Sequence, residues 1–446
     1  MKRSLTMVHQ EQNKGSAAIH AVLLLSIVLT LALCFFHVRG SRTAVLAVLC
    51  GYLGCLAFAC VWHMTLPMLL YFLPWSALMR TNPNAFSFFT FGLVLVCALH
   101  FVKSGLRLRT YQVIAGLLLC VTTLLAKLLH GYSFSFAYIA FLMMIVMFPA
   151  VMEEMREQRY SFFHVVMFFS LGIIIAALCA QYLTIFPDIA QFIRVDSYLQ
   201  IIRRCGFYGD PNFYAAQITA ALAGCLVLVL TTKKKSQTVS LCALIILLLY
   251  CGLLSASKSF VLVAGGLLLL WFAQLLMLKG RVGLKVIMIL VAAITVGYIA
   301  TSSLFGELID DIVVRFSNIS NLDDLTTHRT QLWANYAEAI FLDPRILLFG
   351  NGLTNVKVDG WGAHSTPIQI MWQCGLVGLP VIAMWVIGLL RNGLSNQHAV
   401  RKQILSAAII FCGVYLPWIA IDILFFDEFF LLQAFLICGV RMGLKK

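Results

Sequence analysis

Residues 361–390 read WGAHSTPIQIMWQCGLVGLPVIAMWVIGLL, a short polar turn that runs directly into an apolar stretch. About 20 apolar residues in a helix cross the hydrocarbon core of a bilayer, so the stretch after Ser365 predicts a membrane span. The preceding segment, residues 305–365, is polar and holds eight of the 18 Asp and Glu residues of the chain. The sequence therefore predicts a membrane helix that begins where a large soluble loop ends.

The rest of the 446-residue chain has the composition of a membrane protein, with 61% hydrophobic and 11% charged residues. A soluble domain of this size needs more polar side chains to cover its surface. We predict spans at about 17–37, 43–62, 65–79, 85–102, 110–126, 134–153, 161–186, 210–230, 238–254, 260–278, 284–304, 366–390, 404–421 and 429–440. The third and the last are short enough to be re-entrant or interfacial. The predicted fold is therefore an all-α bundle of about 12 to 14 spans that forms one membrane domain, residues 1–446.

The distribution of charge predicts the orientation of the bundle. With the N-terminus inside and the spans alternating, most of the 32 Lys and Arg fall in cytoplasmic segments and most of the acids fall outside. This is the pattern of the positive-inside rule. It places both termini in the cytoplasm of a cell (inner) membrane and the loops 187–209 and 305–365 outside. The net charge of +14 is explained by this topology and by anionic lipid, so no nucleic-acid partner is expected.

The 14 cysteines lie mostly in apolar spans and form neither a CxxC pair nor the Cys/His spacing of a zinc site. They predict small core residues, without structural disulfides or a cysteine-bound metal. We expect no cofactor and no metal site. Internal repeats are also missing, which disfavours a transporter built from duplicated halves.

Arg203 and Arg204 end the first external loop and precede a Gly-Phe-Tyr-Gly turn whose last residue is Gly209. Asp210-Pro211-Asn212 then reads as the start of a helix, with Asp210 and Asn212 suited to capping and Pro211 tolerated in the first turn. Arginines near span ends often only extend towards the interface. A fixed turn would instead orient them, and planar guanidinium groups suit two-point contact with phosphate oxygens.

Two further cations lie at the same predicted face. Lys258 is in the polar break Ser255-Ala256-Ser257-Lys258-Ser259 between two spans, where a lysine can also extend to the interface at small cost. Arg329 precedes an amphipathic segment that starts near Trp333, and a solvated surface arginine is the alternative for it. Both are candidates for binding an anion together with Arg203 and Arg204.

His364 is the candidate for acid–base chemistry. Ser365-Thr366-Pro367 reads as a helix start in which Ser365 or Thr366 caps the helix. The N-terminus of a helix disfavours imidazolium, so a histidine at this place is expected to be neutral and able to accept a proton. An ordinary interfacial histidine is the alternative.

The spacing around His364 resembles a known signature. His364-Ser365, nine residues, Gly375, two residues and Gly378 match H-[NSFY]-x9-G-x2-[GTY], the pattern of the O-antigen ligases and the related O-antigen polymerases. Further similarities follow in the same order along residues 160–390. They are Asp-Pro-Asn after two arginines, the Ser-Lys-Ser break, the segment from His328-Arg329 to Trp333, and Leu348-Phe349-Gly350-Asn351-Gly352. Lys258 and His328 depart from the family, whose members often carry Arg and Gly at those places.

The resemblance implies a metal-independent, inverting glycosyltransferase that acts on a polyprenyl-diphosphate-linked glycan at the outer face of the inner membrane. His364 would be the catalytic base. Arg203, Arg204, Lys258 and Arg329 would bind the diphosphate leaving group. Gly209, Asp210, Pro211, Asn212, Gly375 and Gly378 would be structural turn and cap residues. The expected partners are the lipid-linked donor, a glycan or lipid acceptor, and membrane lipid.

Several functions remain open at this point. A polymerase would add surface polysaccharide repeat units (O-antigen or capsule), and a ligase would move the finished glycan to a lipid core or wall acceptor; we favour the polymerase. A transporter or flippase of lipid-linked glycan would need charged groups inside the spans, and these are scarce. A structural scaffold would need neither His364 nor the arginines. A glycoside hydrolase could use two of Asp310, Asp311, Asp323 and Asp324, but acids in a soluble loop are usually solvated.

Overall fold

The computed structural model describes residues 2–131, 136–155, 159–193, 195–198, 201–207, 210–277, 329–354, 356–393 and 404–443, with a few residues between 306 and 327. The helices before the loop 187–209 are α1 Lys2–Val38, α2 Arg42–Trp62, α3 Thr65–Phe72, η1 Leu73–Trp75, α4 Phe88–Lys103, α5 Thr110–His130, α6 Phe136–Met147, η2 Phe148–Ala150, α7 Val151–Glu154 and α8 Phe162–Leu183. The later elements are α9 Pro187–Ala190, β1 Val195–Tyr198, β2 Ile201–Arg204, α10 Pro211–Thr231, α11 Lys235–Leu254, α12 Lys258–Met277, α16 Arg329–Leu342, α17 Pro344–Phe349, α18 Thr366–Gly393, α20 Ile404–Tyr415, η3 Leu416–Ala420, α21 Asp427–Cys438 and η4 Gly439–Gly443.

The prediction of an all-α, multi-pass membrane bundle is confirmed. Among the described residues, eight helices are long and apolar enough to cross a membrane. Shorter apolar helices at Thr65–Trp75, Phe88–Lys103 and Tyr138–Glu153 lie between them, and another at Ile404–Ala420 follows the last. The span predicted at 284–304 falls outside the described residues. A helix suits this environment because it satisfies all of its main-chain polar groups internally.

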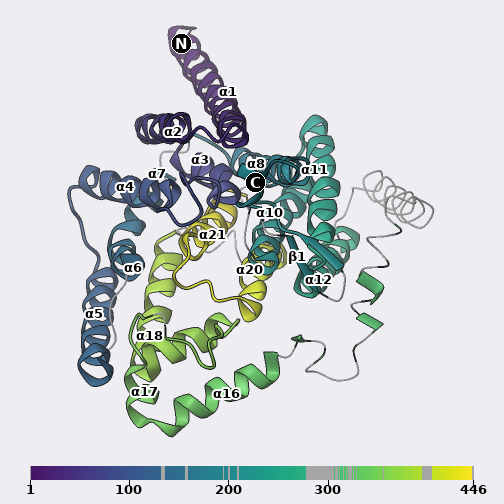
Figure 1. The fold of residues 1–446 in the computed structure, drawn as a ribbon. Helices are drawn as coiled ribbons and strands as arrows, with labels where there is room; N and C mark the ends of the chain where they lie inside the picture. Colours follow the sequence, from purple (N-terminus) through teal and green to yellow (C-terminus); the bar gives the residue numbers. More distant parts are fainter. Residues whose placement is uncertain are drawn as a thin grey trace.

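Helix α10 forms the centre of the bundle and packs against α8, α11, α12, α20 and α21 (Figure 1). Every residue from 211 to 230 is buried except Asn212. Small side chains let its neighbours approach closely: the space beside Gly224 is filled by Phe435 and Val166. Thr219 donates a hydrogen bond to the main-chain O of Gly413 on α20 at 3.0 Å. Small and hydroxyl-bearing residues at helix contacts are typical of membrane bundles.

The two predicted spans that are short enough to be re-entrant or interfacial are part of the core. All residues of α3 are buried, and so are residues 428–438 of α21. Gly172 on α8 leaves room for the main chain of Tyr71, so α3 and α8 are in main-chain contact. Neither segment needs the length of a full span, because each is enclosed by longer helices.

The loop 187–209 contains a small element that the sequence does not predict. Strands β1 and β2 form an antiparallel hairpin in which Asp196 is opposite Arg203 and Val195 is opposite Arg204. The hairpin immediately precedes the turn into α10. It therefore gives the two arginines a fixed direction relative to that helix.

The predicted span at 366–390 is not one continuous helix. Gly375 has φ +63° and ψ −170°, which breaks α18 into two helical parts. A Cβ atom at Gly375 would lie 2.6 Å from the main-chain N of Gly350, and Gly350 itself has φ +71° and contacts the main chain of Gln373. Only glycine adopts such angles without strain, so the Leu348–Gly352 turn and the break in α18 are packed against each other.

The second half of the long loop folds over the start of α18. Tyr336 and Ile340 from α16 form a small core with Ala363 and Trp372. Trp372 donates its indole N–H to the main-chain O of Val356 at 2.9 Å. Figure 1 shows α16 and α17 beside the first part of α18 at the lower edge of the view.

Candidate functional site

Arg203 on β2 contacts the end of α11. Its side chain is only 8% exposed, and its Nε donates to the main-chain O of Ser255 at 3.2 Å. Successive residues of a strand point to opposite faces, and Arg204 is exposed. The structure therefore separates the two predicted arginines: Arg203 points into the protein and Arg204 points away from it.

Asp210 and Asn212 join the hairpin to two helices. Asp210 Oδ1 accepts hydrogen bonds from the main-chain N of Asn212 at 2.7 Å and of Phe213 at 3.4 Å, and so caps α10. Asn212 Oδ1 accepts from Ser257 Oγ at 2.9 Å and from Ser259 Oγ at 3.4 Å. The side chain of Asn212 therefore connects α10 to the start of α12, whereas the sequence predicts that it caps α10.

Lys258 is the first residue of α12. Its Nζ donates to the main-chain O of Asp324 at 2.7 Å. Asp324 belongs to the long loop, so Lys258 attaches that loop to the end of the bundle where α10 begins. This contact gives Lys258 a structural part in addition to the predicted contact with an anion.

Arg329 begins α16 and reaches across to the C-terminal part of the chain. Its Nη1 donates to the main-chain O of Ala420 at 2.7 Å. Burial lowers the pKa of Arg329; the charges of Asp210 and Asp422 raise it, and that of Arg203 lowers it. A guanidinium stays protonated in proteins in spite of such a shift. These effects mean that Arg203 and Arg329 lie within electrostatic range of each other, with two carboxylates nearby.

His364 is held in a strained conformation between two anchored neighbours. Its φ of +46° lies in the left-handed region, which costs a non-glycine residue about 1 kcal/mol or more. On one side, Trp333 Nε1 donates to the main-chain O of Ala363 at 3.0 Å. On the other side, the main-chain N of Ser365 donates to Asp422 Oδ1 at 2.9 Å. The imidazole therefore has a defined place two residues before the first turn of α18.

The start of α18 is stabilised differently from the prediction. The Thr366 hydroxyl donates to the main-chain O of Ile421 at 2.6 Å and accepts from the main-chain N of Ile423 at 3.2 Å. A carboxylate from a distant part of the chain, Asp422, accepts the hydrogen bond from Ser365. The segment 420–424 thus docks on the helix N-terminus and brings a negative charge next to His364.

Burial lowers the pKa of His364 below its ordinary value, and the positive charge of Arg329 lowers it further. Asp422 and Asp210 oppose this effect, because their negative charges favour imidazolium. The ring is therefore neutral at neutral pH, yet carboxylates are near to stabilise it after it accepts a proton. This is the balance that a general base requires.

The structure brings together Arg203, Arg329 and His364 with the acids Asp210 and Asp422, a group that we term the charged cluster. Arg204 lies outside it. Lys258 is adjacent through the Ser255–Ser259 break. Of the remaining predicted residues, Pro211 is in the first turn of α10, and Gly375 and Gly378 lie within α18. Gly209 and His328 fall outside the described residues.

Asp422 is the member of the charged cluster that the sequence analysis missed. It follows η3 in the short connection to α21, where Asp422, Asp427 and Glu428 are three acids within seven residues of an apolar region. That local density of acids between two spans is the signal that could have drawn attention to it. The hydrogen bond between Asp422 and Ser365 could not be predicted from a local sequence pattern, because 57 positions separate the two residues.

The charged cluster combines a neutral imidazole with guanidinium groups, an arrangement suited to taking a proton from one group while stabilising negative charge on another. Among the described side chains, no group of three or more His, Cys, Asp or Glu could hold a metal ion. No protein-family model matches the chain, and no curated protein matches it.

Proposed function

We propose that this protein is a membrane glycosyltransferase that moves a glycan from a polyprenyl diphosphate to an acceptor hydroxyl. The observation that carries the proposal is the charged cluster: a partly buried, neutral His364 within electrostatic range of Arg329, which is itself within range of Arg203. The resemblance of residues 364–378 to the O-antigen ligase and polymerase signature gives the substrate class.

The arginines would act on the donor. Each is held by a main-chain carbonyl, Arg203 by Ser255 and Arg329 by Ala420, so their directions are set before substrate binds. A guanidinium carries five N–H donors in a planar fork. Such a fork suits the oxygens of a diphosphate, whose negative charge grows as the bond to the sugar breaks.

His364 would act on the acceptor. Its imidazole nitrogen takes the proton of the acceptor hydroxyl as that oxygen forms a bond to the anomeric carbon. The bond from the anomeric carbon to the phosphate oxygen breaks at the same time, and its electron pair leaves with the polyprenyl diphosphate. Direct displacement inverts the configuration at the anomeric carbon. The imidazolium that forms is stabilised by the negative charges of Asp422 and Asp210.

Two acceptors are compatible with this chemistry. In a polymerase the acceptor is a lipid-linked repeat unit of O-antigen or capsule, and in a ligase it is a lipid core or wall glycan. We favour the polymerase. By the distribution of Lys and Arg, the reaction would take place at the outer face of the inner membrane.

The test is transfer by the purified protein in lipid, supplied with a polyprenyl-diphosphate-linked repeat unit, with and without a separate acceptor. Polymer from donor alone supports the polymerase, and product only with the added acceptor supports the ligase. His364→Gln should reduce turnover roughly 10²- to 10⁴-fold. His20→Gln, the same change at an exposed position on α1, should keep full activity. Normal transfer by His364→Gln would refute the proposal.

A further inference from the structure

A groove of about 900 Å³ lies between α5 and α18, away from the charged cluster. It is lined by Leu108–Tyr111 from the start of α5 and by residues of α18 from Pro380 to Arg391. His364 lies before the N-terminus of α18, whereas the groove is formed by the C-terminal half of α18, beyond the break at Gly375. The groove and the charged cluster are therefore at different ends of α18.

One face of α18 provides an apolar stripe that ends in a positive charge. Pro380, Met384, Ile387 and Arg391 recur at helical spacing, so they lie along one side of the helix. From Pro380 to Arg391 the stripe is about 16 Å long. Half of the hydrocarbon core of a bilayer is about 15 Å thick, so the stripe matches the length of one acyl chain in one leaflet.

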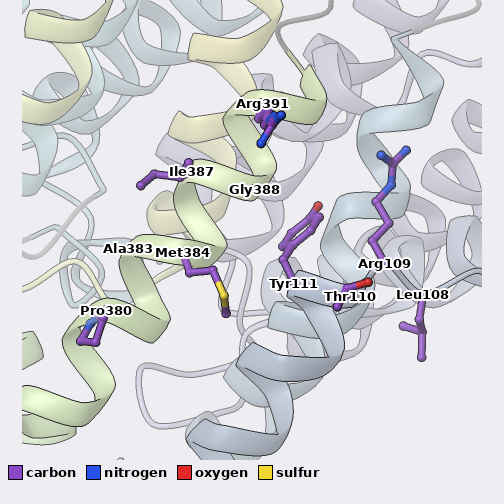
Figure 2. A pocket seen from close by; sticks show the side chains of 10 residues that line it. All are labelled: Leu108, Arg109, Thr110, Tyr111, Pro380, Ala383, Met384, Ile387, Gly388 and Arg391. Carbon is purple, nitrogen blue, oxygen red and sulfur yellow. The ribbon is translucent and has the colours of Figure 1, made fainter.

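Tyr111 lies between the two helices that form the groove. Gly388 allows this approach, because a Cβ atom there would lie 2.6 Å from Cγ of Tyr111. Figure 2 shows the Tyr111 ring between α18 and the start of α5, with the side chains of Arg391 and Arg109 at one end of the groove and Pro380 at the other. Charged and apolar parts of the groove are thus separated along its length.

Two arginines lie at the polar end of the groove, Arg109 and Arg391. Arg109 Nη2 lies 3.6 Å from Glu153 Oε1. Arg391 is exposed, and none of the acids that the structure describes forms an ion pair with it. A singly charged phosphodiester would give Arg391 an anionic partner at this end of the groove.

We infer that this groove binds one anionic phospholipid, with its phosphodiester on Arg391 and Arg109 and an acyl chain along Ile387, Met384 and Pro380. Basic pockets between membrane helices at the cytoplasmic side are typical sites for anionic lipid headgroups, and the Lys and Arg distribution predicts that this end is cytoplasmic. The apolar stripe favours a lipid over a soluble phosphate compound, because Ile387, Pro380 and Ala383 are exposed and would contact an acyl chain. The inference does not depend on glycosyl transfer.

The test is native mass spectrometry of the purified full-length protein with phosphatidylglycerol or phosphatidylethanolamine. We expect retention of one phosphatidylglycerol and little phosphatidylethanolamine. Arg391→Gln should weaken retention about five-fold, the effect of one basic residue at a membrane surface. Ala383→Trp should weaken it without changing charge, by filling the apolar part of the groove.

Arg107→Gln is the matched control, because Arg107 is an exposed arginine in the same connection but does not line the groove. It should retain phosphatidylglycerol as the wild type does. Equal losses in Arg107→Gln and Arg391→Gln would overturn the inference in favour of general surface charge. Equal retention of both lipids, or displacement of phosphatidylglycerol by millimolar glycerol phosphate, would overturn it as well.

Discussion

Trp333→Phe tests whether the strained turn at His364 is held in place by α16. The indole N–H of Trp333 donates to the main-chain O of Ala363, which directly precedes His364. Phenylalanine keeps most of the aromatic contact and removes only the donor. The left-handed conformation of His364 would then be supported mainly from the other side, through Ser365 and Asp422.

The expected size of the effect follows from the environment of this hydrogen bond. Ala363 is 3% exposed, so its carbonyl would lose its partner in a place that water hardly reaches. The net loss of a hydrogen bond costs about 1 kcal/mol, and a buried carbonyl left unpaired costs about 1–3 kcal/mol. The turn at His364 is strained, so it is expected to relax to another conformation once this hydrogen bond no longer holds it. A loss of about 1–3 kcal/mol corresponds to roughly a 5- to 150-fold smaller population of the productive His364 conformation.

The assay is steady-state transfer with purified protein, with kcat and KM for the lipid-linked donor measured separately. We expect kcat to fall about 5- to 150-fold while KM for the donor changes little, since the arginines that would bind the diphosphate are untouched. Trp361→Phe is the control. Trp361 is 65% exposed, and Tyr336 donates to its main-chain O, which the substitution keeps. An unchanged kcat in Trp333→Phe, or an equal fall in both variants, would refute the reasoning.

The other predictions concern the charged cluster and the break in α18. Arg203→Lys should reduce kcat/KM at least about ten-fold, because one ammonium cannot replace a guanidinium fork. Arg204 is exposed, so Arg204→Lys should keep a kcat/KM near wild type. Similar kcat/KM values for the two variants would contradict the separation of Arg203 from Arg204 on β2. Since burial and Arg329 lower the pKa of His364, the acidic limb of the pH profile of kcat/KM should lie below pH 6.5. Arg329→Gln removes a positive charge near His364 and should move this limb to higher pH. A limb that does not move in Arg329→Gln would exclude His364 as the titrating base. Gly375→Ala should lower the melting temperature measured in detergent. An alanine at this positive φ costs about 1–2 kcal/mol, and its Cβ atom would collide with the main chain of the Leu348–Gly352 turn. A melting temperature equal to wild type would contradict the close packing of that turn against the break in α18.

Several parts of the architecture could be predicted without coordinates. Apolar runs reveal membrane helices because the bilayer requires a continuous apolar surface and internally satisfied main-chain groups. Capping of α10 by Asp210 follows from local chemistry, since the capping carboxylate and the main-chain N–H groups that donate to it are within three residues. The burial of α3 and α21 does not follow in this way, because their length alone is equally compatible with an interfacial position.

The sequence by itself determined the class of protein, an all-α multi-pass membrane bundle, and it singled out His364, Arg203 and Arg329 through local pattern and resemblance. Only the tertiary structure decided which of these residues meet: it turned Arg204 away, attached Lys258 to the long loop, and brought Asp422 to the main chain beside His364. The physical reason is the range of the interactions. Helix formation and capping depend on neighbours in the chain, whereas the pKa of a partly buried imidazole and the direction of a guanidinium depend on groups that only packing brings close.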